Sequence, residues 1–211
     1  MLEGSPESIL ALANQWSSSM TMEVAERILR FFLRLLEWNA RVNLTGAQSI
    51  SGLIGDHLPD SFALSRMVPF GCDVLDVGSG GGLPAIPFLL MRPDCLVTLS
   101  EPRAKRVAFL NAAVREFGCG NAKVVRSRFE DFASIHFGVV TSRATFRPSE
   151  WLDIGFSALS PGGRLVLLST EEAHPDDGAK RLLDSVGYCT ASGASRWAGC
   201  FCSTWNTPEH D

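Results

Sequence analysis

The stretch Asp73-Val-Leu-Asp-Val-Gly-Ser-Gly-Gly-Gly-Leu-Pro84 decides the fold of this 211-residue chain. Its first five residues predict a buried strand, and the glycines predict a tight turn into a helix that has Pro84 in its first turn. Gly78 and Gly80 permit backbone conformations and close approaches that a Cβ would block. Because the helix after the turn presents free N–H groups, the stretch predicts a ligand site at the end of the strand.

Two acidic residues favour a ligand at this turn over the alternative, a glycine-rich turn that binds nothing. Asp76 precedes the glycines, and Glu101 ends the next apolar run, Leu96-Val-Thr-Leu-Ser-Glu101. A carboxylate at the tip of the second strand can accept hydrogen bonds from both hydroxyls of a ribose. We therefore expect Asp76, Gly78, Gly80 and Glu101 to bind a cofactor that contains a nucleoside.

The class of cofactor follows from what the turn lacks. The dinucleotide fingerprint G-x-G-x-x-G needs a third glycine where this chain has Leu83, and no Gly-Lys-Ser/Thr of a P-loop follows. The pattern Asp-x-Gly-x-Gly is typical of S-adenosylmethionine enzymes, so this cofactor is favoured over a nicotinamide or a flavin. Phe129 and Glu130, just past the third strand, could cover the adenine and mark its edge. For Glu130, capping of a short helix is the alternative.

Short apolar runs alternate with helical stretches after Gly71, which predicts βα units and a parallel sheet. We expect an α/β fold with a Rossmann-like, mostly parallel sheet, its strands at 73–77, 96–100, 123–126, 139–142 and 164–168. Helices are expected after Leu83, Arg103, Pro148 and Pro175. The runs 187–191 and 200–205 have no helix-length segment between them, so they should pair as an antiparallel hairpin at the sheet edge.

The first 70 residues predict an N-terminal helical extension, 1–70, in front of a cofactor-binding domain, 71–211. Ser5-Pro6-Glu7 is typical of a helix start, and from Thr21 apolar residues recur at helical spacing. Arg27, Arg30, Arg34 and Glu37 fall together on another side of this second helix. Its arginines form a basic edge, which is either an ordinary solvated face or an RNA contact: Arg27, Arg30, Arg34 and Arg41.

The composition limits the possible partners. Hydrophobic residues make up 45% of the chain and the formal charge is −4, so there is a sizeable core and no global positive field to attract nucleic acid. The six cysteines show no CxxC spacing, and we expect reduced thiols and no metal. No apolar run reaches the roughly 18 residues of a membrane helix. We therefore expect a cytoplasmic protein without membrane contact, and a monomer.

Motifs over most of 39–168 resemble one family. These are Asn43-Leu-Thr45, His57 with Asp60-Ser61, Asp76-Val-Gly-Ser-Gly-Gly-Gly-Leu-Pro84, Lys105-Arg106-x-x-Phe109-Leu110 and Thr141-Ser-Arg-Ala144. Their order and spacing are similar to those of the small-subunit ribosomal RNA guanine-N7 methyltransferases, also called glucose-inhibited division protein B. The resemblance implies methyl transfer from S-adenosylmethionine to N7 of a guanine in small-subunit (16S) ribosomal RNA or an assembly intermediate. It also implies cofactor contacts at Gly78, Leu83, Phe129, Glu130 and Arg143, with Glu101 in the ribose position.

Guanine N7 is a ring lone pair with no proton to lose, so its methylation needs positioning and no general base. Arg143 is the expected catalytic residue, because its fork can donate to the acceptor face of guanine or to the cofactor carboxylate. The alternative is an ion pair between Arg143 and a nearby acid. We expect substrate contacts from Asn43, His57 and Arg147. For Asn43 the alternative is a cap, and for His57 a local hydrogen bond.

Two departures from the family pattern keep other functions open. Ser169-Thr170 and Cys200-Phe-Cys-Ser-Thr-Trp-Asn206 stand where similar proteins carry a lysine-glycine pair and a basic strand. The acidic loop 171–177 would repel phosphate if it faced the substrate. The alternatives are therefore a small-molecule methyltransferase, or a noncatalytic module that binds S-adenosylmethionine or RNA.

Overall fold

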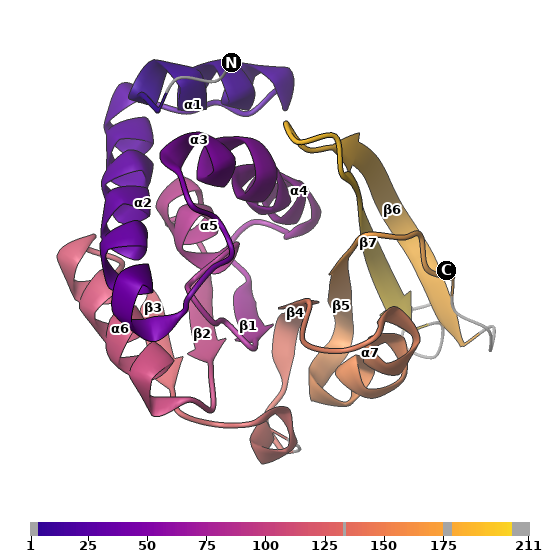
Figure 1. Cartoon of the computed structure of the whole chain (residues 1–211). Coiled ribbons are helices and arrows are strands. Elements are labelled where there is room, and N and C mark those ends of the chain that lie inside the picture. The colour runs from indigo at the N-terminus through magenta and orange to yellow at the C-terminus, as the bar shows by residue number, and fades with distance from the viewer. Residues whose placement is uncertain (1–3, 133, 175–178, 204–211) are drawn as a thin grey trace.

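The computed structural model describes residues 4–132, 134–174 and 179–203. A seven-stranded sheet with the order β3-β2-β1-β4-β5-β7-β6 forms its centre (Figure 1). The strands are β1 (Asp73–Val77), β2 (Leu96–Ser100), β3 (Ala122–Val125), β4 (Phe137–Arg143), β5 (Leu159–Ser169), β6 (Lys180–Cys189) and β7 (Ser195–Ser203). β1 to β5 run parallel, and β7 lies antiparallel between β5 and β6. The predicted α/β class with a C-terminal antiparallel hairpin is confirmed.

Apolar clusters cover both faces of the central strands, and successive side chains of a strand point to opposite faces. Val74 of β1 joins one apolar cluster, and its neighbour Leu75 joins the other. The helices are α1 (Pro6–Gln15), α2 (Met22–Val42), α3 (Ile50–Gly52), the π-helix η1 (Leu53–His57), α4 (Leu58–Met67), α5 (Ala85–Met91), α6 (Ala104–Glu116) and α7 (Pro148–Ile154), with 3₁₀ turns η2 (Phe129–Phe132) and η3 (Gly155–Ala158). Residues of α1, α2 and α4 to α6 lie in the Val74 cluster, and those of α7 in the Leu75 cluster.

The N-terminal helices form as their sequence predicts. Ser5 caps α1 by accepting from the Ser8 N–H at 3.4 Å, and Thr21 caps α2 by accepting from Val24 at 3.3 Å. The apolar stripe of α2 is fully buried on the sheet side, and it belongs to the same cluster as Val74. Where one domain ends and the next begins stays a prediction. No helix within the described ranges has the length and apolar character to span a bilayer.

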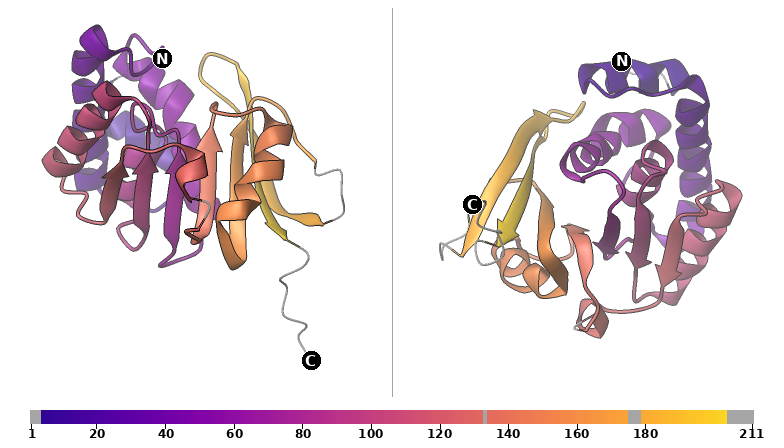
Figure 2. Two further views of the ribbon diagram at one scale, coloured as in Figure 1. Left: turned by 90° about the horizontal axis from the view of Figure 1, so that it is seen from below. Right: turned by 180° about the vertical axis from the view of Figure 1, so that it is seen from behind.

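The C-terminal hairpin differs from its predicted extent. Its strands are longer than 187–191 and 200–205, and Lys180–Cys189 is a strand where a helix was expected after Pro175. The reason is tertiary, because β6 pairs with β7 along almost its whole length, and this pairing outweighs the helical propensity of Lys180-Arg-Leu-Leu183. Residues 175–178 and Trp205 lie outside the described residues. Figure 2 shows the hairpin at one end of the sheet and β3 at the other.

Candidate active site

The glycine turn after β1 closes over the end of β2. The N–H groups of Gly78 and Ser79 donate to the Ser100 carbonyl at 2.9 and 3.0 Å. Gly78 has a φ of +76° and Gly80 a φ of +56°, the left-handed region that favours glycine. A Cβ on Gly78 would lie 2.2 Å from the Thr145 hydroxyl oxygen. The turn therefore brings bare backbone against the segment that follows β4.

Glu101 sits beneath this turn with only 3% of its surface exposed. Its Oε2 accepts from the Gly80 N–H at 3.1 Å, and its Oε1 accepts from the Arg103 N–H at 2.8 Å. The Arg106 guanidinium lies 3.7 Å from Oε2 and also donates to the Asn43 carbonyl at 3.3 Å. The carboxylate is thus held at the tip of β2 by backbone donors, under a cation that links α6 to the end of α2.

Asp76 carries a buried oxygen without a partner. The residue is 3% exposed, and its Oδ2 makes no hydrogen bond within the part of the chain that the structure describes. Burial raises the pKa of Asp76 to about 6. An unpaired buried carboxylate oxygen is costly, and a cationic donor would satisfy it. The ammonium group of S-adenosylmethionine has the required charge, so the site fits this cofactor.

Arg143 ends β4 and lies at the centre of a second cluster. Its Nη1 donates to Asp60 Oδ2 at 2.6 Å and to His57 Nδ1 at 3.2 Å. The other oxygen of Asp60 accepts from the Tyr188 hydroxyl at 2.7 Å. The alternative expected for Arg143, an ion pair with a nearby acid, is therefore present. The Arg143 side chain is still 23% exposed, so donors remain for a ligand.

His57 is a neutral member of this cluster. Burial, followed by the neighbouring Arg143, lowers the pKa of His57 to about 4. Because an arginine can only donate, His57 Nδ1 is the acceptor of the bond between them. His57 is the last residue of the π-helix η1, and π-helices often occur at functional sites.

A cavity of about 270 Å³ opens beside this cluster at the carboxyl ends of β4 and β5. His57, Asp60 and Arg143 line one part of it, and Arg196 of β7 lines another. Glu171 also lines the cavity, so the described part of the acidic loop does border the site. Parallel α/β sheets bind their ligands at this edge. No three His, Cys, Asp or Glu side chains in the described ranges gather as a metal site.

Four residues of this region have no role in the prediction from sequence. Asp60 and Arg106 belong to family motifs that assign them no role of their own, and Arg196 lies before the segment 200–206 that departs from the family pattern. Tyr188, the only tyrosine of the chain, carried no motif signal at all. What brings it to the site is the pairing of β6 with β7, which places Tyr188 opposite Arg196.

Leu83 and Phe129, two of the predicted cofactor contacts, are almost fully buried. Leu83 is 7% exposed and Phe129 is 9% exposed. The Phe129 ring packs edge-on against Phe146 and Trp151, with centroids 6.2 and 5.4 Å apart. Glu130 lies in the first turn of η2, where Asp131 makes the capping bond to the Arg128 N–H at 2.8 Å. Their cofactor contacts stay predictions.

The predicted substrate contacts are scattered. Asn43 ends α2 as its left-handed C-cap, whereas the alternative expected for it was a cap that begins a turn or helix. Asn39 holds the loop after it by accepting from the N–H groups of Leu44 and Thr45 at 2.6 and 2.9 Å. Arg147 is exposed as the N-cap of α7. The structure brings only His57 of these candidates to Arg143.

The basic edge of α2 is partly used inside the protein. Arg27 donates to the Phe117 carbonyl, and Arg34 pairs with Glu37 at 2.7 Å and Glu116 at 2.9 Å. Arg30 and Arg41 are exposed. Two of the four arginines therefore tie α2 to the end of α6.

Fold and site together define the class of protein: a Rossmann-like, S-adenosylmethionine-dependent methyltransferase. An S-adenosylmethionine-dependent methyltransferase from Aquifex aeolicus shares the fold, with a TM-score of 0.53 at 18% identity over 71% of this chain and 92% of that one. The chain belongs to the GidB family, rRNA small subunit methyltransferase G, whose model matches residues 24–183.

Curated relatives agree with the family. Ribosomal RNA small subunit methyltransferase G of Stenotrophomonas maltophilia is 35% identical over 175 residues, which cover 82% of this chain and 81% of the relative. The protein of the same name from Ralstonia nicotianae is 35% identical over 166 residues, which cover 74% of each chain.

Proposed function

We propose that this protein transfers a methyl group from S-adenosylmethionine to N7 of a guanine in small-subunit (16S) ribosomal RNA. The observation that carries the proposal is the partly exposed Arg143 guanidinium, which lines a cavity at the carboxyl ends of β4 and β5. Guanine presents two adjacent acceptors, O6 and N7, on one edge. Donation from Arg143 to O6 orients that edge and leaves the N7 lone pair free to react.

The residues around the glycine turn bind the cofactor in this proposal. Glu101 accepts from the ribose hydroxyls, Asp76 accepts from the ammonium group, and the bare backbone of Gly78 and Gly80 allows close approach. When bound, S-adenosylmethionine supplies an electrophilic methyl group on a sulfonium.

No side chain needs to accept a proton in the reaction. The nucleophilic nitrogen carries no hydrogen, so Arg143 and its partners orient the guanine and exclude water. His57 is uncharged at neutral pH because its pKa is lowered to about 4. His57 therefore stays uncharged from about pH 6 to 8, and no general base titrates in the chemical step.

The names of the relatives support small-subunit RNA as the partner. We place the protein in the cytoplasm as a monomer, and residues 1–70 as the part that helps hold the RNA. A small-molecule methyltransferase is the second candidate. Glu171 favours it, because this acid lines the cavity where an RNA phosphate would be repelled.

The test is a transfer assay with radiolabelled S-adenosylmethionine and separate pools of small-subunit RNA, intact small subunits that lack guanine-N7 methylation, large-subunit RNA and metabolites. We expect label in the small-subunit RNA or subunit, and strand cleavage at the modified guanine after reduction and aniline treatment. Single-turnover rates at saturating S-adenosylmethionine should be flat from about pH 6 to 8. Label confined to metabolites, or to an exocyclic amine, would exclude the proposed reaction.

A further inference from the structure

Tyr188 lies outside the proposed machinery, yet it touches the partner of Arg143. Its hydroxyl donates to Asp60 Oδ1 at 2.7 Å, while Asp60 Oδ2 accepts from Arg143 at 2.6 Å. Asp60 is only 2% exposed. Each oxygen of this buried carboxylate therefore has a different partner, one from β4 and one from β6.

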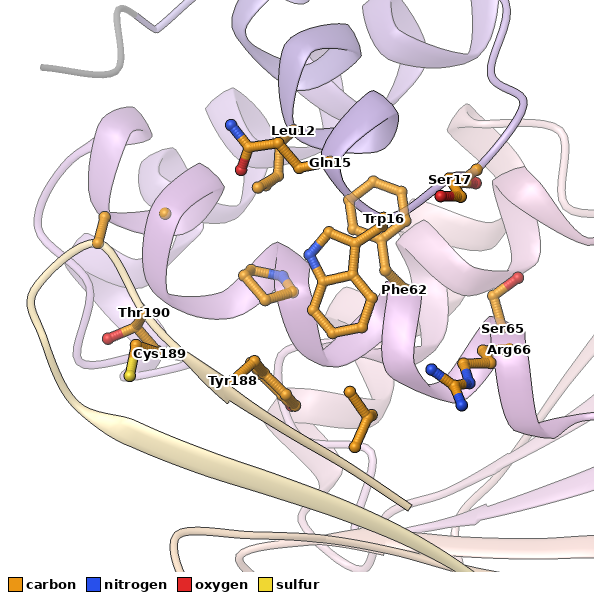
Figure 3. Close-up of a pocket in the computed structure, with 15 residues that line it drawn as sticks. Leu12, Gln15, Trp16, Ser17, Phe62, Ser65, Arg66, Tyr188, Cys189 and Thr190 are labelled. Carbon is orange, nitrogen blue, oxygen red and sulfur yellow. The ribbon is translucent and has the colours of Figure 1, made fainter. Parts of the chain in front are cut away.

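The ring of Tyr188 is fixed independently of its hydroxyl. Trp16, just after α1, meets it edge-on with ring centroids 5.0 Å apart, and stacks against Phe62 of α4 at 6.0 Å (Figure 3). The ring lines a second cavity of about 930 Å³, bounded by α1, α4 and β6. Burial and the adjacent Asp60 raise the pKa of Tyr188 above its usual range, so the hydroxyl keeps its proton.

We propose that Tyr188 is a positioning residue for the reaction, which holds Asp60 in the rotation that aims the Arg143 guanidinium at the substrate cavity. This inference rests on the proposed function of Arg143. Without the hydroxyl, Oδ1 of Asp60 loses its donor in a buried place. The carboxylate then turns both oxygens toward Arg143, in the bidentate arrangement that arginine favours, and draws the guanidinium out of line.

Tyr188→Phe removes the hydroxyl and keeps the ring. Because small misplacements of a positioning group have large effects on rate, we expect kcat to fall roughly tenfold or more, with KM for S-adenosylmethionine little changed. In an Arg143→Ala background the same substitution should have no further effect, because there is no guanidinium left to aim.

Asp184→Asn is the matched control. Asp184 also ties β6 to α4, through a two-pronged ion pair with Arg66 at 2.9 and 3.0 Å, but it does not touch Asp60 or Arg143. Loosening of the hairpin alone would affect both variants equally. The proposal is overturned if Tyr188→Phe lowers kcat no more than Asp184→Asn does, or if its effect persists in full without Arg143.

A readout without activity separates this inference from the proposed function. In protein labelled with ¹⁵N-arginine, the side-chain N–H signal of Arg143, assigned with Arg143→Lys, should shift or broaden in Tyr188→Phe and stay in place in Asp184→Asn. An unchanged signal in Tyr188→Phe contradicts the positioning role even if RNA is methylated. A shifted signal supports it even if wild-type protein methylates no RNA, an outcome that removes only the proposed function.

Discussion

At the scale of single residues, this site combines two acids in opposite situations. Glu101 accepts hydrogen bonds from the backbone N–H groups of Gly80 and Arg103, whereas Asp76 is buried with an oxygen that has no partner among the described residues. The first is a carboxylate fixed in place before any ligand arrives. The second is a local cost to folding, which a cationic ligand group would remove.

Asp76→Asn should change how stability depends on pH. The pKa of Asp76 rises from 3.8 to about 6 on folding, so its contribution to stability is present below pH 4 and is lost as pH rises through 6. From pH 4 to pH 7.5, the free energy of unfolding of the variant, relative to that of the wild type, should therefore rise by about 2 to 3 kcal/mol. Urea denaturation of both proteins at the two pH values measures this. If the difference in free energy of unfolding between the two proteins is the same at both pH values, Asp76 does not ionise near pH 6.

Glu101→Gln should weaken the binding of S-adenosylmethionine by about 1 to 3 kcal/mol. The substitution keeps the shape of the side chain and removes the charge that strengthens hydrogen bonds to ribose hydroxyls. Calorimetric titration gives the affinity, and Glu150→Gln at an exposed position of α7 serves as the control. Equal affinities for the two variants would argue against the ribose role.

At the scale of elements, α2 shows how one helix face divides its charges. Arg27 and Arg34 reach the C-terminal end of α6, where Phe117 and Glu116 accept from them. Arg30 and Arg41 stay exposed. The predicted basic edge therefore consists of a packing pair and an exposed pair, and we propose the exposed pair for RNA contact.

We expect Arg30→Gln with Arg41→Gln to weaken RNA binding and to reduce its salt dependence by up to about two counterions. The matched pair, Arg27→Gln with Arg34→Gln, should instead lower thermal stability, because it removes contacts between α2 and α6. Affinity at several salt concentrations, together with thermal denaturation of both double variants, tests the division. If the exposed pair leaves the salt slope unchanged, the edge is an ordinary solvated face.

At the scale of the whole molecule, the N-terminal helices and the sheet share one apolar cluster. Ile9 of α1 and Phe31 of α2 are fully buried in the same cluster as Val74 of β1. The turn of the β6–β7 hairpin closes on η1, since Ala191 N–H donates to the Gly55 carbonyl at 3.1 Å. The turn of the C-terminal hairpin thus packs against the segment that carries His57.

Ile9→Ala should therefore destabilise the whole molecule. A buried large-to-small change costs about 2 to 5 kcal/mol, which lowers Tm by about 5 °C or more in a chain of this size. Calorimetry should show one transition in wild type and variant, shifted as a unit. Two transitions, with only the first sensitive to Ile9→Ala, would show that residues 1–70 unfold separately.

The sequence by itself determined the parts of the protein that depend on local order. The glycine turn, the acid at the tip of β2 and the alternation of strands with helices are written in short stretches, so fold and cofactor class followed from them. The caps at Ser5 and Thr21 were equally local. A hydrogen bond between neighbours in the chain needs no knowledge of distant segments.

Only the tertiary structure decided what faces Arg143. Asp60 is 83 positions from Arg143 and 128 positions from Tyr188 in the sequence. No spacing rule connects residues so distant. The same holds for the strand at Lys180–Cys189, whose local composition favours a helix until β7 pairs with it. Long-range pairing brings such groups together, because buried polar atoms and strand edges must find partners wherever the fold supplies them.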